Sequence, residues 1–332
     1  MTTSLVTGGL GFIGSHLVAL LQQRGHRIRI LDLATPTDPH PEIDYITGSI
    51  TDASVVQQAT QGVQQVYHLA ANAGLWSPRK SEFVTINQTG TRNVMAAALA
   101  AGVERVVHCS TESILKSVKN TDSKGGKTDE TVDLTLEDMA GAYCRGKFVA
   151  EQEAFAAARQ GLPVVIVNPT VPIGPGDRRI TPPTRMMLGF LNGKYPAYLN
   201  STLNLIDARD VALGHVLAAE RGTPGDRYIL GNVNITLGEL LQRLEAVTGL
   251  AMPKRQIPYW LAYGVSALQE MVADYITKSP PSAPLTGVKL ARSPMTFDNS
   301  KAQGQLGLRF RPLEDSLKAA VTDYRQRGLL TR

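Results

Sequence analysis

The chain of 332 residues is long enough for about two domains of ordinary size, so it can bury a core without disulfide or metal crosslinks. With 43% hydrophobic and 19% charged residues, its composition is globular, which excludes disordered, collagen-like and disulfide-scaffold proteins. The net charge of +5 includes no dense basic run, so we expect no nucleic-acid partner.

Cysteine usage and the N-terminus bear on the compartment. The two cysteines, Cys109 and Cys144, lack the CxxC spacing of a zinc site, and the histidines do not cluster. We therefore expect no bound metal and a reducing, cytoplasmic environment. The first residues lack the basic and apolar regions of a signal peptide, and the longest apolar stretch elsewhere is interrupted by Gln269 and Glu270. No integral membrane segment is expected.

Apolar runs typical of strands alternate with helix-period segments along the first half of the chain. This alternation indicates βαβ units, and therefore an α/β fold with a doubly wound parallel sheet of the Rossmann type. The run at 164–167 is continuously apolar, as expected for a strand covered on both faces. The predicted strands lie at 4–7, 28–31, 65–69, 105–109 and 164–167, and the predicted helices at 13–24, 82–100 and 139–158.

Frequent proline and glycine after Asn168 interrupt the α/β repetition, so a second, smaller region begins there. Residues 203–206, 210–220 and 227–230 indicate a return to the sheet. We predict a first domain over 1–170, with returning segments at about 203–231. The smaller substrate-binding region covers 171–202 and 232–332, with helices at 237–247 and 260–276.

A glycine-rich turn follows the first predicted strand, with Gly8, Gly11 and Gly14 spaced three residues apart directly before a helix. Such glycines allow a tight turn and let a pyrophosphate approach backbone N–H groups at the helix start, here those of Phe12 and Ile13. The alternative is that they only serve the strand-to-helix turn. The context favours a dinucleotide site.

Asp32 closes the second predicted strand, eighteen residues after Gly14, where a carboxylate accepts hydrogen bonds from the adenosine ribose of a dinucleotide. A 2′-phosphate would meet like charge there, and the next residues, Leu33 to Thr35, supply no cation. NAD is therefore favoured over NADP as cofactor. The alternative is that Asp32 caps the following turn.

Tyr143 and Lys147 lie four residues apart in a predicted helix, so they share one face. A phenol has a pKa of about 10, and acid/base work near neutrality requires a decrease worth roughly 4 kcal/mol. One cation about 4 Å away, at an effective dielectric near 20, supplies about that much. Alone, this spacing is common on helix surfaces. The glycine turn upstream favours a catalytic pair.

Two hydroxyls, Ser110 and Thr111, follow the predicted strand at 105–109, at the edge where open α/β sheets bind ligands. We expect one of them to orient a substrate oxygen, and the spacing alone does not decide which. They could instead cap a turn.

Six segments together resemble the extended short-chain dehydrogenase/reductase superfamily, which includes NAD-dependent epimerases and dehydratases. The likeness covers the N-terminal two-thirds and is nearest to the dihydroflavonol-4-reductase-like and hopanoid-associated sugar epimerase branch, with 3β-hydroxysteroid dehydrogenases more distant. The segments are TGGLGFIG at 7–14, HLAA at 68–71, NQTGTRNV at 87–94, HCSTES at 108–113, YCRGK at 143–147 and NPTVPIGPGD at 168–177.

This resemblance implies roles for individual residues and a homodimer paired through a helical face. Tyr143 would be the acid/base, Lys147 would bind the nicotinamide ribose and lower the tyrosine pKa, and Thr111 would be the hydroxyl partner. Asn87 would hold the active-site helix and a water molecule. The resemblance also implies that the ribose contacts the backbone of Leu69, Ala70 and Ala71, and that the nicotinamide contacts Pro169 and Val171.

The chain departs from the family pattern in two places. Ser49 and Ile50 stand where most members have Asp-Leu, so the usual carboxylate contact to adenine is replaced at most by a single hydroxyl. Ile114 and Leu115 stand where sugar epimerases have Tyr-Gly, which weakens the prediction of a sugar substrate.

The predicted function is an NAD-dependent oxidoreductase that interconverts a secondary alcohol and a ketone on a small or medium-sized, partly apolar substrate. The alternatives are an NAD-dependent epimerase or dehydratase of a nucleotide-linked sugar, and a non-catalytic dinucleotide sensor. Met and aromatic side chains over 186–198 suit an apolar substrate, although an ordinary packed helix explains them equally. For residues 257–276, a plain core helix is favoured over a substrate, subunit or membrane contact.

Overall fold

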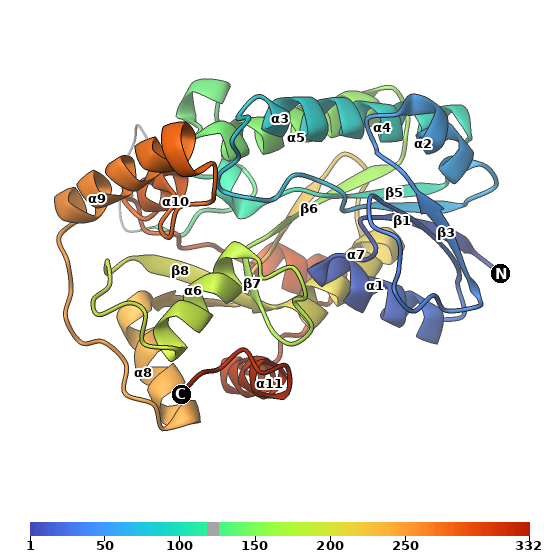
Figure 1. Ribbon diagram of the computed structural model, residues 1–332. Helices are drawn as coiled ribbons and strands as arrows, with labels where there is room; N and C mark the ends of the chain where they lie inside the picture. The colour runs from blue at the N-terminus through green and yellow to red at the C-terminus, as the bar shows by residue number, and fades with distance from the viewer. Residues whose placement is uncertain (118–125) are drawn as a thin grey trace.

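The computed structural model describes residues 1–117 and 126–332, and its centre is a parallel sheet of seven strands (Figure 1). The strand order is β3-β2-β1-β4-β5-β6-β9, so the chain winds outward in both directions from β1. This confirms the predicted doubly wound fold. The strands are β1 (Thr3–Thr7), β2 (Arg27–Asp32), β3 (Ile43–Thr47), β4 (Gln65–His68), β5 (Arg105–Cys109), β6 (Val164–Pro169) and β9 (Arg227–Leu230).

Helices cover both faces of this sheet (Figure 1). On β6, Val164 and Ile166 pack into the core beneath α2, α4 and α5, while Val165 and Val167 pack into the core beneath α1 and α7. A strand buried on both faces reads as a continuous apolar run, as this one does. The helices are α1 (Phe12–Gln23), α2 (Ala53–Thr60), α4 (Gly90–Ala100), α5 (Ala142–Arg159) and α7 (Ala208–Arg221).

A second, three-stranded sheet forms from β7 (Val171–Ile173), β8 (Thr202–Asp207) and β10 (Val233–Thr236), in the order β10-β8-β7. The returning chain therefore joins the small sheet at β8 first and re-enters the large sheet only with α7 and β9. The small sheet packs with α6 (Pro182–Leu191), α8 (Leu237–Thr248) and α11 (Leu313–Gln326). How these parts divide cofactor and substrate binding remains a prediction.

The side chains of α6 bear on one open alternative. Met187, Phe190 and Leu191 are buried in the core shared with α8 and α11, as is Tyr198 beyond the helix. This packing favours the ordinary packed helix over a substrate-lining role for these four residues.

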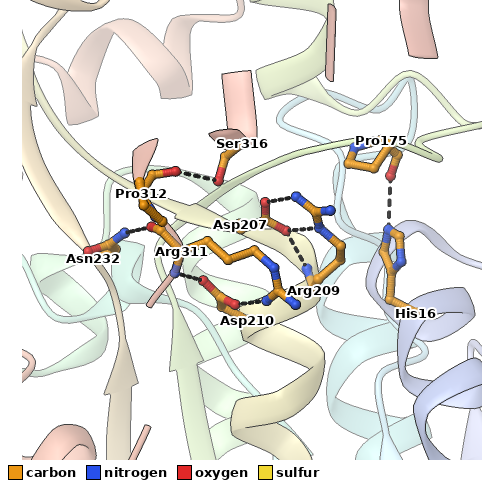
Figure 2. A network of polar contacts seen from close by, with 9 residues as sticks. All are labelled: His16, Pro175, Asp207, Arg209, Asp210, Asn232, Arg311, Pro312 and Ser316. Atoms are coloured by element: carbon orange, nitrogen blue, oxygen red, sulfur yellow. Dashed lines mark hydrogen bonds and ion pairs between the residues drawn. The ribbon is translucent and has the colours of Figure 1, made fainter. Parts of the chain in front are cut away.

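Two ion pairs fix the start of α7 (Figure 2). Asp207 accepts hydrogen bonds from the backbone and guanidinium of Arg209, and the fully buried Asp210 pairs with Arg311 and accepts from its backbone N–H at 2.7 Å. Because Arg311 directly precedes α11, these contacts join the end of the chain to the large sheet.

The segment 257–276 differs from the prediction. It forms α9 (Tyr259–Val272), followed by the π-helical turn η4 (Ala273–Thr277), but it lies at the margin of the molecule (Figure 1). Within α9 only Ala262 and Ser266 are buried. The prediction of a plain core helix is therefore wrong, because its apolar residues extend round more of the helix than one packed face can cover. No helix in the described part of the chain has the length and apolar character needed to cross a bilayer.

Candidate active site

The glycine-rich turn joins β1 to α1 and packs too closely for side chains. Gly8 has a φ of +72°, and its carbonyl accepts from the N–H of Gly11 at 3.0 Å. A Cβ on Gly14 would lie 2.2 Å from that carbonyl oxygen, so no side chain fits there. Gly11, at the cap position, supplies no side-chain hydrogen bond to α1. The backbone N–H groups at this helix start therefore fit a pyrophosphate, the group predicted from the sequence.

The turn after β4 lies directly beside the glycine turn. Leu69 donates its backbone N–H to the carbonyl of Thr7 at 3.1 Å, and Ala70 donates to the Thr7 hydroxyl at 3.2 Å. A Cβ on Gly8 would lie 2.8 Å from the Ala70 nitrogen. Pro169 ends β6 at the same edge of the parallel sheet. The edge therefore gathers segments that are far apart in sequence.

Asp32 lies at the carboxyl end of β2 and is 6% exposed. Its carboxylate accepts from the backbone N–H of Leu10 and of Ala34, each at 3.1 Å, and from the guanidinium of Arg179 at 3.0 Å. The sequence inference that no cation lies near Asp32 is therefore wrong, because Arg179 is 147 residues away along the chain.

The loop that bears Arg179 is attached to α1. His16 on α1 shares a hydrogen bond with the carbonyl of Pro175 at 2.9 Å (Figure 2). Gly176 has a φ of +88°, and a Cβ there would lie 3.5 Å from the His16 ring. The loop thus passes close over the start of α1 and brings a cation to the predicted adenosine end of the site.

Ser49 and Ile50, which depart from the family pattern directly after β3, have hydrogen-bond partners inside the protein. The Ser49 hydroxyl is hydrogen-bonded to the Thr51 hydroxyl at 2.8 Å and accepts from the Thr51 N–H at 3.1 Å. Ile50 is buried against Gly90 of α4, and its carbonyl accepts from the Asn93 amide at 3.0 Å. Their contact with adenine remains a prediction.

Asn87 lies in a π-helical turn, η1 (Thr85–Thr89), between the short helix α3 (Glu82–Val84) and α4. Its amide accepts from the N–H of Asn72 at 2.7 Å and donates to the carbonyl of the same residue at 3.2 Å. Single π turns are frequent at functional sites. Here the turn directs a buried amide at the loop after β4.

Thr111, which follows β5, joins the candidate catalytic groups. Its hydroxyl donates to the carboxylate of Glu112 at 2.8 Å and lies 3.0 Å from the Ser113 hydroxyl. Tyr143, on the first turn of α5, lies next to Thr111, whose hydroxyl acts to lower the pKa of the phenol. Burial raises the pKa of Glu112 to about 7. A carboxyl, a threonine hydroxyl and a phenol therefore form one connected group.

Tyr143 and Lys147 are both held by groups near the end of β5. Burial raises the pKa of Tyr143 far above its usual range, and the Glu112 carboxylate raises it further. The Lys147 ammonium, which is 4% exposed, donates to the Cys109 carbonyl at 2.7 Å, and burial lowers its pKa. Burial and a neighbouring carboxylate therefore oppose the decrease in the Tyr143 pKa that the sequence predicts from Lys147, and that decrease remains a prediction.

Sequence reasoning missed Glu112 and Arg179. Glu112 could have been found from the sequence, because it directly follows Ser110 and Thr111 and therefore lies at the same edge of the sheet. No local pattern could assign Arg179, whose partner is distant in sequence.

A cavity of about 190 Å³ lies between the start of α5 and α9. Phe83, whose ring meets the Tyr143 ring edge-on at 6.2 Å, lines it together with Ala142 at the start of α5. Trp76, Lys80 and Glu270 of α9 form other parts of its wall. Tyr143 itself does not line the cavity.

The doubly wound sheet, the glycine turn and the Tyr-x-x-x-Lys helix define an enzyme of the extended short-chain dehydrogenase/reductase type. The family model described as "NAD dependent epimerase/dehydratase family" matches residues 4–231, and the chain belongs to this family. The cofactor of the family is NAD, as the sequence predicted.

Relatives extend over nearly the whole chain. A putative dihydroflavonol 4-reductase of Synechocystis is 41% identical over 330 residues, 97% of this chain and 94% of its own. Sterol demethylase protein B of Methylococcus capsulatus is 30% identical over 334 residues, 99% of this chain and all of its own. The crystal structure of gox2253 superposes with a TM-score of 0.85 at 35% identity and covers 100% of both chains.

Proposed function

We propose that this enzyme interconverts a secondary alcohol and a ketone on a small or medium-sized, partly apolar substrate, with NAD as cofactor. The observation behind the proposal is the connected group of Tyr143, Thr111 and Glu112 at the sheet edge that also bears the glycine turn. The names of the two relatives, a dihydroflavonol reductase and a sterol demethylase protein, favour an apolar substrate over a sugar nucleotide.

The residues around the edge fit NAD. The pyrophosphate would lie on the turn and helix start formed by Gly8, Gly11, Phe12, Ile13 and Gly14, because a helix N-terminus attracts an anion. The rest of the NAD would lie along the same edge of the large sheet, with its nicotinamide ribose at Lys147. Bound NAD supplies the hydride acceptor for alcohol oxidation and, when reduced, the hydride donor for ketone reduction. The other proposed contacts are Asp32, Ser49, Ile50, Leu69, Ala70, Ala71, Pro169 and Val171.

Proton transfer would fall to Tyr143. Because burial and Glu112 raise its pKa, the phenol is held protonated and can donate to a substrate oxygen as ketone becomes alcohol. Thr111 would orient that oxygen. Asn87 would hold the loop after β4 in register with the site through its two hydrogen bonds to Asn72.

Glu112 would restore the lost proton. A carboxyl with a pKa of about 7 is partly protonated at neutrality. After Tyr143 gives its proton to the substrate, Thr111 passes its hydroxyl proton to the phenolate and takes the Glu112 proton in its place. The carboxylate then regains a proton from solvent. In alcohol oxidation each transfer runs in reverse.

The Tyr143→Phe variant tests the acid/base role. Because the phenol oxygen forms no part of the glycine turn, we expect NAD affinity within about twofold of the parent and turnover lower by at least about 100-fold. Stopped-flow single turnovers with a panel of apolar ketones and reduced NAD would measure both. Turnover equal to that of the parent would refute the proposed role.

The second candidate is an epimerase or dehydratase of a nucleotide-linked sugar, which the family's range of activities favours. The absorbance of reduced NAD separates the two. An oxidoreductase consumes or forms reduced NAD in proportion to product, whereas an epimerase restores its cofactor within each cycle.

The compartment and assembly belong to the same proposal. Both cysteines are free thiols, which fits a reducing cytoplasm. We propose a homodimer paired through a helical face, as the resemblance to the superfamily implies.

A further inference from the structure

Large apolar side chains gather on the outer surface of α9 and η4. Of the thirteen large hydrophobic side chains exposed in the described residues, eight belong to this one segment. Trp260, Tyr275 and Ile276 are 72%, 79% and 75% exposed, values unusual for such residues. We call this set the α9 face: Trp260, Leu261, Tyr263, Val265, Leu268, Met271, Tyr275 and Ile276.

The acidic residues of the segment turn away from this face. Glu270 and Asp274 both pair with Lys80, at 2.9 and 2.6 Å, and Asp274 also accepts from the Trp76 indole at 2.7 Å. These contacts attach the inner side of α9 to the wall of the cavity that Phe83 and Trp76 line. The outer side of α9 is left uncharged.

Basic residues flank both ends of the α9 face. Lys254 and Arg255 precede α9 and are exposed, and Lys278 follows η4 and is exposed. No acidic or basic residue occurs from 256 to 269. An exposed apolar stripe with aromatic residues and cationic ends is typical of a helix that lies in the interface of an anionic bilayer.

The same charges argue against a second copy of the chain on this face. Whether two α9 helices paired parallel or antiparallel, the basic end of one would meet a basic end of the other. A layer of anionic headgroups meets both ends favourably at once.

We propose that the α9 face docks the enzyme on the surface of an anionic lipid bilayer. Given the proposed function, the substrate is then an apolar alcohol or ketone that enters from the bilayer. Docking itself can be measured without turnover, so a failure of docking and a failure of the proposed function are distinguishable.

Cosedimentation of the full chain with vesicles tests the docking. Vesicles of phosphatidylcholine and phosphatidylglycerol in equal parts should bind the protein, and vesicles of phosphatidylcholine alone should bind it far more weakly. The double variant Trp260→Glu/Leu268→Glu should lose binding by more than about 100-fold, because two inserted side chains become charged. The Lys254→Gln/Arg255→Gln variant should bind the anionic vesicles about 30-fold more weakly than the parent does, with no such loss on vesicles of phosphatidylcholine alone.

Leu99→Glu provides a matched control, because Leu99 is an exposed apolar residue on α4, 39% accessible and outside the α9 face. It should bind vesicles as the parent does. Equal binding of the parent and the Trp260→Glu/Leu268→Glu variant would overturn the proposal, as would no binding by the parent. Sedimentation velocity gives a further outcome: a parent dimer that Trp260→Glu/Leu268→Glu converts to monomer, without vesicle binding, would assign the face to a second copy and also overturn it.

Discussion

Replacement of the half-buried Glu112 by glutamine should stabilise the fold at alkaline pH and leave it unchanged in acid. Burial raises the pKa of this carboxyl from 4.5 to about 7. That difference corresponds to about 3 kcal/mol of preference for the protonated form in the folded state. Because the folded state binds the proton more tightly than the unfolded chain does, the free energy of unfolding falls as pH rises from about 4.5 to about 7.

Glutamine retains the shape of the protonated acid and still accepts from Thr111, but it does not titrate. Glu112→Gln should therefore exceed the parent by about 3 kcal/mol in free energy of unfolding near pH 8.5, and by about zero near pH 4.5. Urea unfolding at both pH values, followed by the fluorescence of the buried Trp76, measures the difference.

The exposed Glu42 supplies the control for this experiment. Glu42→Gln should match the parent at both pH values, since this exposed side chain makes no buried contact that the substitution could change. If Glu112→Gln and the parent differed in free energy of unfolding by the same amount in acid and in alkali, burial would not destabilise the Glu112 carboxylate. The proposed relay through Thr111 would then lose its proton source.

Gly14→Ala should abolish measurable NAD binding, because its Cβ would lie 2.2 Å from the Gly8 carbonyl oxygen and force the turn open. Isothermal titration calorimetry measures the binding. The control is Gly304→Ala, where no atom lies within 4 Å of the added carbon, and this variant should bind NAD as the parent does. Asp32→Ala should weaken NAD binding by about 10-fold or more and strengthen NADP binding, because it frees Arg179 for a 2′-phosphate. Adding Arg179→Ala should remove the NADP gain, and an unchanged NADP affinity in the single variant would refute this account of Arg179.

The sequence predicted the large sheet well because its strands have strong local signals. The run 164–167 and the glycine turn were recognisable from a few adjacent residues, and β6 and α1 lie where these indicated. The weakly apolar β3 and the short α2 were missed. Every residue of β3 is half-buried or exposed, so this strand at the edge of the sheet has no clear hydrophobic pattern in its sequence.

Side-chain partners were much less accessible to sequence reasoning. Thr111, Tyr143 and Lys147 were chosen from spacing and resemblance, and the structure brings Thr111 and Tyr143 together. The predicted decrease in the Tyr143 pKa considered only Lys147, because the four-residue spacing reveals neither the burial of Tyr143 nor the neighbouring Glu112, which both raise that pKa.

The sequence by itself determined the parallel sheet and the glycine-rich turn, and it singled out the candidate acid/base residues, since each depends on neighbours within one turn or strand. Only the tertiary structure decided that Arg179 reaches Asp32, that the Glu112 carboxylate accepts from the candidate hydroxyl of Thr111, and that α9 exposes its apolar residues to solvent. These features depend on which distant segments are packed together, and an apolar helix has the same sequence pattern whether or not a partner covers it.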